Sequence, residues 1–128
     1  MLYGILKLRA EVFVVEQACA YLDPDGRDLE PSTRHLWQED ETGAVIAALR
    51  VLQEPDGSSI GRVVTAPSHR SQGRAADLVR DALAAAPRPV RINAQSHLVE
   101  WYGRFGFAVA GEEFVEDGIP HTPMVVAT

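Results

Sequence analysis

The pattern of apolar and polar positions along the chain predicts three helices. Apolar residues near the start recur with helical spacing and predict a helix over residues 2–13 that gives way to an apolar stretch. The clearest pattern covers residues 75–86, where one apolar stripe lies opposite charged residues and two prolines follow closely. A shorter helix is expected over residues 97–104, ahead of Gly106.

Between these helices, short runs of apolar and β-branched residues predict strands. The expected strands cover residues 35–38, 44–52, 60–65, 90–94, 107–110 and 123–127. Turns are expected at 41–43, 55–59 and 116–118, and the stretch 22–34, dense in Asp, Pro and Gly, is expected to be a loop. A helix, antiparallel strands and then alternating strands and helices predict a single mixed α/β domain over residues 1–128.

Length and composition narrow the class of protein. A chain of 128 residues, 46% of them hydrophobic, fits one folded domain. No apolar run approaches the roughly 18 residues that a membrane-spanning helix needs, and the opening segment lacks a signal-peptide cleavage site. A single cysteine, Cys19, excludes an internal disulfide and suits a reducing compartment. We therefore expect a cytoplasmic protein that does not act at a membrane.

The net charge of −6 is distributed unevenly. Residues 1–58 contain 11 acidic and 5 basic residues, residues 59–111 contain 3 acidic and 7 basic residues, and residues 112–128 contain 4 acidic residues and no Lys or Arg. An acidic chain argues against nucleic acid as the main partner. The pattern suits an anionic ligand held by the middle segment and a cationic one approached by the flanks. A chance scatter of solvated charges explains it equally well.

The segment RSQGRA at residues 70–75 joins a predicted strand to the clearest predicted helix. A helix N-terminus offers free backbone N–H groups and a partial positive charge. Gly73 lets the backbone approach a ligand closely, and Arg70 and Arg74 add charge, so the segment suits a pyrophosphate. It has neither the P-loop lysine nor the three-glycine dinucleotide fingerprint, which argues against an NTPase and a Rossmann dehydrogenase. An ordinary turn with surface arginines is the alternative.

RSQGRA resembles the R/Q-x-x-G-x-G/A pyrophosphate loop of the GNAT superfamily of N-acetyltransferases, and YGRFGF at residues 102–107 resembles the superfamily's Y-x-x-x-G-F. Further stretches are similar to its ElaA-like branch, in the same order along the chain. They are VFVVEQ at 12–17, YLD at 21–23, DG at 25–26, RH at 34–35, IGRV at 60–63, AQSH at 94–97 and EDGIPH at 116–121. The resemblance covers nearly the whole chain.

The resemblance implies a GNAT acyl-CoA N-acyltransferase fold, with a central, mostly antiparallel sheet flanked by helices. It also implies acetyl-CoA as co-substrate. The family's first strand normally precedes the helix that opens this chain, so that strand is either missing or omitted from the numbered chain. The residues implied to bind acetyl-CoA are Val63, Val64, Thr65, Arg70, Ser71, Gln72, Gly73, Arg74, Ala75, Gln95 and Tyr102. Ala75 stands where a second glycine is commoner, and Gln95 where many relatives have Asn.

The family's reaction is the direct attack of an amine on the thioester. The ammonium must lose a proton, an oxyanion forms, and the thiolate must leave. The resemblance implies that Tyr102 protonates the thiolate; a half-buried aromatic is the alternative. A backbone N–H near Val64 is the expected donor to the oxyanion. Glu16, Glu113 and His121 are candidate bases, a carboxylate if burial raises its pKa and the histidine because it titrates near neutrality. Solvated carboxylates and a turn-bonding histidine are the alternatives.

Two functions from different classes follow. The first is an N-acetyltransferase that acts on a primary amine, a cationic one given the acidic flanks. The second is a catalytically silent GNAT-like module that binds CoA or another protein. We expect no metal, because Asp23, Asp25 and Asp28 lack the glycine and glutamate spacing of a calcium loop and the histidines lack metal-ligand spacing. A sheet edge exposed by the missing strand offers a route to a homodimer.

Overall fold

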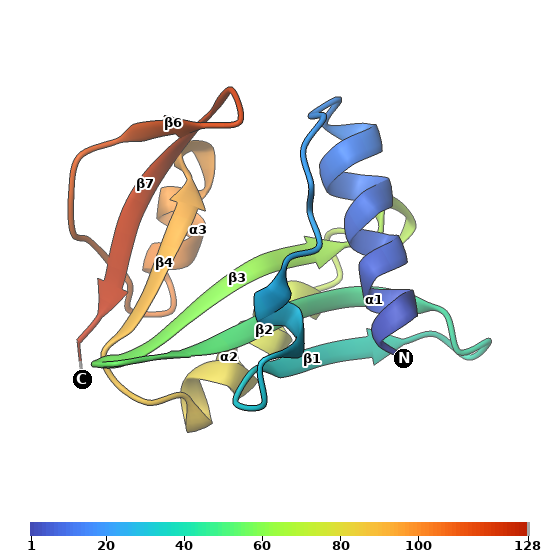
Figure 1. The fold of residues 1–128 in the computed structure, drawn as a ribbon, viewed down its shortest axis with the longest axis horizontal. Helices are drawn as coiled ribbons and strands as arrows, with labels where there is room; N and C mark the ends of the chain where they lie inside the picture. The colour runs from blue at the N-terminus through green and yellow to red at the C-terminus, as the bar shows by residue number, and fades with distance from the viewer. Residues whose placement is uncertain (128) are drawn as a thin grey trace.

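The computed structural model describes residues 1–127 and shows one twisted, mixed sheet with helices on both faces (Figure 1). Within these residues the sheet has seven strands, of which six follow the order β1-β2-β3-β4-β7-β5 and the seventh, β6, pairs with β7. Their bounds are β1 Arg34–Glu39, β2 Val45–Glu54, β3 Gly57–Thr65, β4 Val90–Gln95, β5 Ala108–Val109, β6 Phe114–Glu116 and β7 Ile119–Val126. Only β3 and β4 pair in parallel, which confirms the expected mixed, mostly antiparallel sheet.

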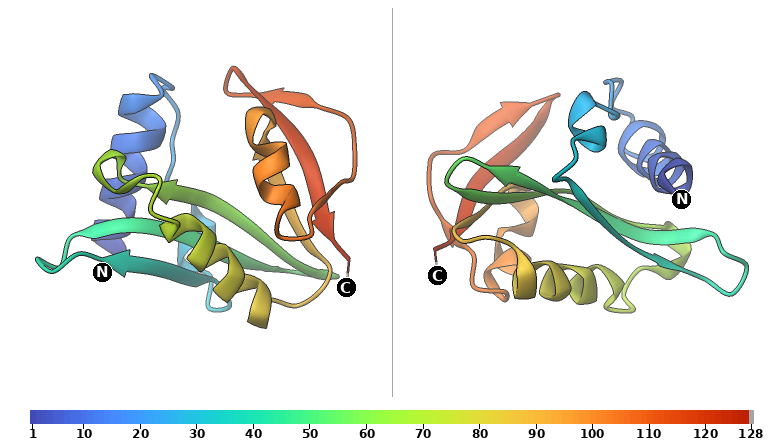
Figure 2. Two further views of the ribbon diagram at one scale, coloured as in Figure 1. Left: turned by 180° about the vertical axis from the view of Figure 1, so that it is seen from behind. Right: turned by 60° about the horizontal axis from the view of Figure 1, so that its bottom comes forward.

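Helices cover both faces of the sheet (Figure 2). They are α1 Leu2–Arg9, the π-helix η1 Ala10–Glu16, α2 Arg74–Ala85 and α3 Val99–Gly103, with 3-10 turns η2 Gly26–Leu29, η3 Pro67–His69 and η4 Ser96–Leu98. Helix α1 and η1 lie on one face of the sheet, and α2 and α3 lie on the other. No helix in the described residues is both long and apolar enough to cross a membrane.

The apolar stripe expected over residues 75–86 is the face that α2 buries. Leu78, Val79 and Ala82 are almost fully buried and belong to one core with Leu49 of β2 and Ile60 of β3. Burying a Leu or Val side chain stabilises a fold by roughly 1.5–3 kcal/mol. This packing holds α2 against the sheet, and with it the loop that precedes the helix.

Two elements in the first half extend three residues beyond their expected ends. The helix predicted over residues 2–13 continues as η1 to Glu16, so the apolar stretch after it is helical too. Strand β3 begins at Gly57, three residues earlier than predicted, and the turn before it is correspondingly shorter. A Cβ atom at Gly57 would lie 2.2 Å from the carbonyl oxygen of Pro89, so only glycine permits this close approach of the chains.

The C-terminal part contains three strands where the sequence predicts two. Strand β7 begins at Ile119 rather than at residue 123, and it pairs with the unpredicted strand β6. Pro120 and Pro123 lie within β7. Because proline cannot donate to a strand ladder, its presence argues against a central strand in a sequence. The α-helix predicted over residues 97–104 is shorter than expected. It begins at Val99 as α3, after the 3-10 turn η4.

Strands β3 and β4 pair only at Ser58 with Val90 and at Ser59 with Arg91. Further along, β3 remains paired with β2, and β4 remains paired with β7. The two strands therefore diverge and divide the sheet into two parts (Figure 1). Within residues 1–127 the backbone groups on the facing edges have no strand partner beyond these positions, so they are free to bind a ligand.

Candidate active site

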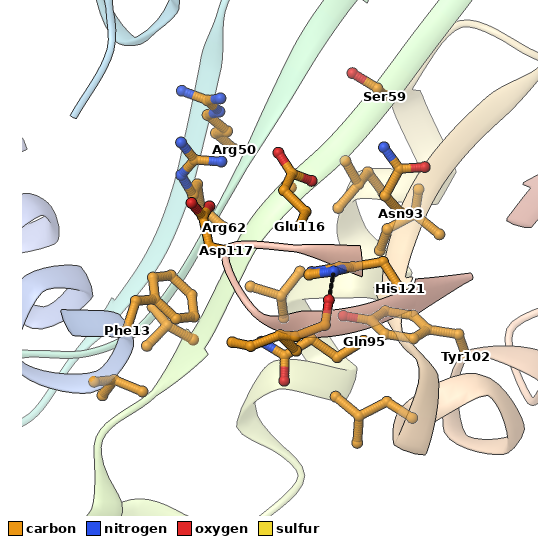
Figure 3. Close-up of a pocket in the computed structure, with 18 of the residues that line it drawn as sticks. Phe13, Arg50, Ser59, Arg62, Asn93, Gln95, Tyr102, Glu116, Asp117 and His121 are labelled. Carbon is orange, nitrogen blue, oxygen red and sulfur yellow. Dashed lines mark hydrogen bonds between the residues drawn. The ribbon is translucent and has the colours of Figure 1, made fainter. Parts of the chain in front are cut away.

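A cavity of about 1370 Å³ occupies the wedge between β3 and β4. Its walls come from η1, β3, β4, α3 and the β6–β7 hairpin (Figure 3). Pockets for a single small ligand usually measure about 300–1,000 Å³. The cavity therefore has room for an extended ligand together with a second, smaller one.

The wall formed by β3 is irregular where it meets the cavity. The register between β2 and β3 shifts between Ala48 and Arg50, and Arg62 has a φ of 53°. Such a β-bulge bends the strand and changes the direction of the residues beside it. Residues 63–65, for which the resemblance implies contact with acetyl-CoA, follow the bulge and line the cavity.

The loop before α2 leaves the end of that helix open. Gly73 precedes the helix with a φ of 75°, a conformation that favours glycine. No side chain caps the helix there, so N–H groups of the first turn are free to bind an anion. The backbone before α2 therefore has a conformation that suits an anion, and the binding of a pyrophosphate there stays a prediction.

Some residues of the loop at 70–75 line the cavity and others do not. Arg70 and Ala75 line the cavity, whereas the four residues between them lie outside its wall. Arg74 donates hydrogen bonds to the side-chain oxygens of Gln72, at 2.9 Å, and Gln38, at 3.2 Å. Arg74 therefore joins its own loop to β1.

Arg70 and Glu16 form a two-pronged ion pair that joins the loop to the end of η1. The Nη1 and Nη2 groups of Arg70 donate to the Glu16 carboxylate at 2.6 and 2.8 Å. The hydrogen bond from Arg70 lowers the pKa of Glu16. A carboxylate that acts as a base at neutral pH needs a raised pKa. Glu16 was a candidate only if burial raised its pKa, and this condition is not met. Glu16 is instead the partner of the loop arginine.

Tyr102 on α3 combines deep burial with an unpartnered hydroxyl. The residue is 5% exposed, and its ring lies edge-on to Trp101 and Phe107, with centroids 4.8 and 6.0 Å away. Its hydroxyl has no hydrogen-bond partner within residues 1–127 and points into the cavity (Figure 3). Burial raises the pKa of Tyr102, so the phenol keeps its proton at neutral pH. Because this hydroxyl faces the cavity and has no partner in the protein, it is available to a ligand.

His121 lies opposite Gln95 in the β4–β7 register, and both line the cavity with Tyr102 (Figure 3). Its Nδ1 is 2.7 Å from the carbonyl oxygen of Ile119. A carbonyl only accepts, so Nδ1 carries a proton and Nε2 of the neutral ring does not. The ring stacks on Phe114, with centroids 5.7 Å apart, which holds its orientation. His121 can therefore accept a proton at Nε2.

The structure does not bring Glu113, the third candidate base, to the cavity. Glu113 is exposed, precedes β6 and forms no part of the cavity wall. The hairpin instead places Glu116 and Asp117 on that wall. The sequence analysis assigns both to a turn and gives them no role. The sequence feature that could have identified these two residues is their short spacing to His121. This spacing becomes informative only once β6 is known to pair with β7.

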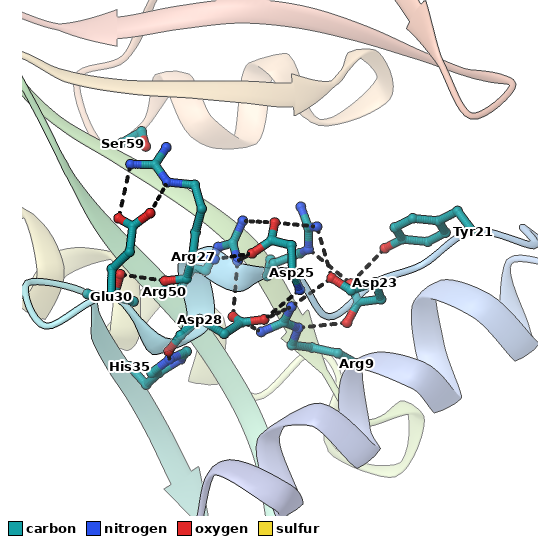
Figure 4. Close-up of polar contacts among 12 residues, drawn as sticks. Arg9, Tyr21, Asp23, Asp25, Arg27, Asp28, Glu30, His35, Arg50 and Ser59 are labelled. Atoms are coloured by element: carbon teal, nitrogen blue, oxygen red, sulfur yellow. Dashed lines mark hydrogen bonds and ion pairs between the residues drawn. The ribbon is translucent and has the colours of Figure 1, made fainter.

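A buried network of arginines and aspartates forms the structure behind the cavity wall (Figure 4). Arg9, 1% exposed, lies 2.8 Å from Asp23 and 2.8 Å from Asp28. Arg50 of β2 lies 2.7 Å from Asp25 and 3.0 Å from Asp28. The network joins α1, the segment around η2 and β2, and thereby gives a fixed position to a stretch predicted to be a loop.

This network also accounts for the positions of Asp25 and Asp28, two of the aspartates that the sequence analysis compares with a calcium loop. Asp25 and Asp28 cap η2 reciprocally, each side chain accepting from a backbone N–H near the start of the turn. Their other oxygens, Oδ2 of Asp25 and Oδ1 of Asp28, accept hydrogen bonds from Arg50. Within residues 1–127 no group of acidic, histidine or cysteine side chains is arranged to hold a metal ion.

Comparisons with known proteins agree with this geometry. The sequence profile of the acetyltransferase (GNAT) domain matches residues 10–128. UPF0039 protein Rv2851c of Mycobacterium tuberculosis is 48% identical over 129 residues, which cover 97% of this chain and 83% of that protein. ElaA of Escherichia coli is 39% identical over 133 residues, which cover 96% of this chain and 85% of ElaA.

Two crystal structures share the fold over nearly the whole chain. An acyl-CoA N-acyltransferase from Pseudomonas aeruginosa superposes with a TM-score of 0.90 at 41% identity, covering 98% of this chain and 89% of that one. ElaA of Escherichia coli superposes with a TM-score of 0.86 at 36% identity, covering 97% and 88%. The family profile, the relatives and the folds agree: the chain belongs to the GNAT acetyltransferase family and resembles its ElaA branch.

Proposed function

We propose that the protein transfers an acetyl group from acetyl-CoA to a primary amine, by direct attack of the amine in a ternary complex. The observation that carries this proposal is the presence of Tyr102 and His121 in one cavity. Tyr102 is a buried phenol that keeps its proton, and His121 has an Nε2 that can accept one. Aminolysis of a thioester needs an acid and a base with these opposite tasks.

The shape of the wedge supports a path for acetyl-CoA. The uncapped start of α2, with Gly73 before it, suits the pyrophosphate. From there the pantetheine arm would run along residues 63–65, whose cavity-side backbone groups are not paired with β4. Gln95 lies across the wedge on β4 and would contact the same arm. The thioester would then lie near Tyr102.

In the reaction, His121 Nε2 accepts the proton that the ammonium group must lose. The neutral amine attacks the thioester carbon, and a backbone N–H of the bulged strand near Val64 donates to the oxyanion. As the C–S bond breaks, Tyr102 donates its proton to the departing sulfur, and the second proton that the attacking nitrogen loses on becoming an amide restores the phenol of Tyr102. The products are the N-acetylated amine and CoA.

The acceptor would enter from the side of η1 and the β6–β7 hairpin, because the loop at residues 70–75 belongs to the CoA end. These walls come from the acidic segments 1–58 and 112–128. A surface of one sign attracts ligands of the other, so we expect an amine that is cationic in solution.

Release of the CoA thiol, measured against a panel of primary amines, tests the proposal. Turnover that depends on both substrates would support it. Clear acetyl-CoA binding without turnover on any amine would favour the catalytically silent module. Acetyl-CoA at about 100 times its Kd should stabilise the fold by about 2.7 kcal/mol. An unchanged melting temperature in saturating acetyl-CoA would contradict both the transferase and a silent module that binds CoA.

A further inference from the structure

The two arginines of the loop before α2 have partners of different charge. Arg70 donates to both oxygens of the Glu16 carboxylate, at 2.6 and 2.8 Å. Arg74 donates to the neutral amide oxygens of Gln72 and Gln38, and in the described part of the chain no carboxylate forms an ion pair with it. The loop therefore presents one positive charge that is already compensated and one that is not.

The guanidinium group of Arg70 joins three segments of the chain. Besides Glu16 at the end of η1, it contacts the end of β3, because its Nε donates to the carbonyl oxygen of Thr65 at 3.3 Å. The 3-10 turn η3 lies between Thr65 and Arg70, so this hydrogen bond also closes the turn. A guanidinium is planar and rigid, so these contacts fix its direction. Arg70 thereby connects the loop to two walls of the cavity.

The residue that follows Arg70 needs such support from its surroundings. Ser71 has a φ of 64°, in the left-handed region that residues other than glycine rarely adopt. A backbone in such a conformation persists only where neighbouring contacts hold it. The contacts of Arg70 before this position and of Arg74 after it hold the strained stretch at both ends.

The exposure of the ion pair limits what it can contribute. The side chains of Glu16 and Arg70 are each 41% exposed, and exposed ion pairs add little to the stability of a fold. An arginine that already has a carboxylate partner also attracts a further anion less than an unpaired one does. The contribution that remains is geometric, since the pair holds the loop in one position relative to η1 and β3.

We propose that Glu16 and Arg70 are positioning residues for acetyl-CoA, and that Arg70 does not itself supply the charge that binds the pyrophosphate. The pair holds the loop in the conformation that presents its backbone N–H groups at the start of α2. Those groups and the uncompensated charge of Arg74 bind the anion. This inference rests on the proposed function, and for Arg70 it replaces the direct contact that the family resemblance implies.

Glu16→Gln separates this role from a purely electrostatic one, because the two predict opposite results. If Glu16 only competed for the charge of Arg70, removing a negative charge beside a polyanion would tighten acetyl-CoA binding. If the pair positions the loop, the Kd for acetyl-CoA, measured by calorimetric titration, should rise by about two- to fivefold, as expected for the loss of one exposed ion pair. Glu16→Asp keeps the charge, shortens the reach, and should weaken binding as well.

The matched control is Glu11→Gln. Glu11 lies on η1 like Glu16 and forms an ion pair with Lys7, but it lies outside the wall of the cavity. The control therefore removes an acidic charge and an exposed ion pair from the same helical stretch, and the Kd for acetyl-CoA should not change.

Arg70→Lys tests the other member of the pair. Lysine keeps the positive charge but cannot form the two-pronged contact, so the Kd should rise as in Glu16→Gln. The double variant E16Q/R70K should bind little worse than either single variant, because each change already removes the same contact. In steady-state kinetics the KM for acetyl-CoA should rise and kcat should change much less, since Tyr102 and His121 are intact.

Each outcome decides the inference. Weaker binding in both Glu16 variants, with Glu11→Gln unchanged and melting temperatures close to that of the wild type, would support it. Tighter or unchanged binding in Glu16→Gln would overturn it, and so would an Arg70→Lys variant that binds acetyl-CoA as the wild type does. If acetyl-CoA binds but no amine is acetylated, the proposed transfer fails and the Kd values still decide the inference. If the wild type does not bind acetyl-CoA, both fail.

Discussion

At the scale of single residues, the proposed reaction depends on the hydroxyl of Tyr102 and not on its ring. Phenylalanine keeps the edge-on contacts with Trp101 and Phe107 but removes the proton donor. We expect Tyr102→Phe to lower kcat by about 10²-fold or more, as is typical for the loss of a general acid. The Kd for acetyl-CoA, measured by calorimetric titration, should change little. An unchanged kcat would remove Tyr102 from the mechanism.

His121 belongs to the same scale, because its role depends on one nitrogen. Replacing it with Asn removes the proton acceptor at Nε2, so kcat/KM for the amine should fall by about 10²-fold or more near neutral pH. The loss should shrink as the pH rises, because more of the amine is then already neutral. A pH series of initial rates measures this. His69→Asn, which changes a histidine outside the cavity wall, should keep the wild-type profile, and the same profile in both variants would assign the proton to another group.

At the scale of the element, the start of α2 depends on a backbone conformation. A Cβ atom at Gly73 would meet no other atom within 4 Å, but the φ of 75° disfavours any other residue. Gly73→Ala should therefore reduce the free energy of unfolding by about 1–2 kcal/mol and raise KM for acetyl-CoA, since strain is relieved by moving the loop. Urea unfolding and steady-state kinetics measure these effects. Gly103→Ala, inside α3 and equally free of contacts, should not destabilise; equal losses in both variants would contradict the role of φ.

The elements also show what the sequence can and cannot predict. Local pattern suffices for α2 and its loop, because a stripe, a glycine and two prolines all lie within about 20 residues. The β6–β7 hairpin escapes prediction because Pro120 and Pro123 lie in β7. The wedge exists because β3 and β4 stop pairing after a short stretch. This pairing joins residues far apart in the sequence, so local pattern does not predict it. Glu16 was a candidate base for the same reason: its partner, Arg70, is 54 positions away.

On the scale of the whole molecule, buried ion pairs connect segments that no shared strand joins. Arg9 on α1 and Arg50 on β2 both bind Asp28, which lies between them in space but in a separate stretch of the chain. Removing one member of a buried pair typically costs about 3–5 kcal/mol, because the other charge remains buried without compensation. The position of α1, and with it the η1 wall of the cavity, therefore depends on charges as well as on apolar packing.

The same network makes stability depend on pH. Burial alone would raise the pKa of Asp28, but hydrogen bonds from Arg9 and the backbone, with Arg50 adding to them, outweigh it and hold the pKa at about 2. Because this is below the ordinary value of 3.8, the folded state favours the charged form. The stabilisation, about 2 kcal/mol, is fully present above pH 5 and is lost as the pH falls toward 2.

Urea unfolding of the wild type and of Asp28→Asn at pH 7 and pH 3 tests this coupling. The variant should be less stable at pH 7, because Arg9 and Arg50 lose a buried carboxylate partner. It should also show a smaller loss between pH 7 and pH 3, because the group whose protonation weakens the wild type is gone. Asp81→Asn, at an exposed position on α2, should lose stability between the two pH values as the wild type does. A loss in Asp28→Asn as large as in the wild type would mean that other carboxylates control acid unfolding, and that Asp28 does not connect α1 to the sheet electrostatically.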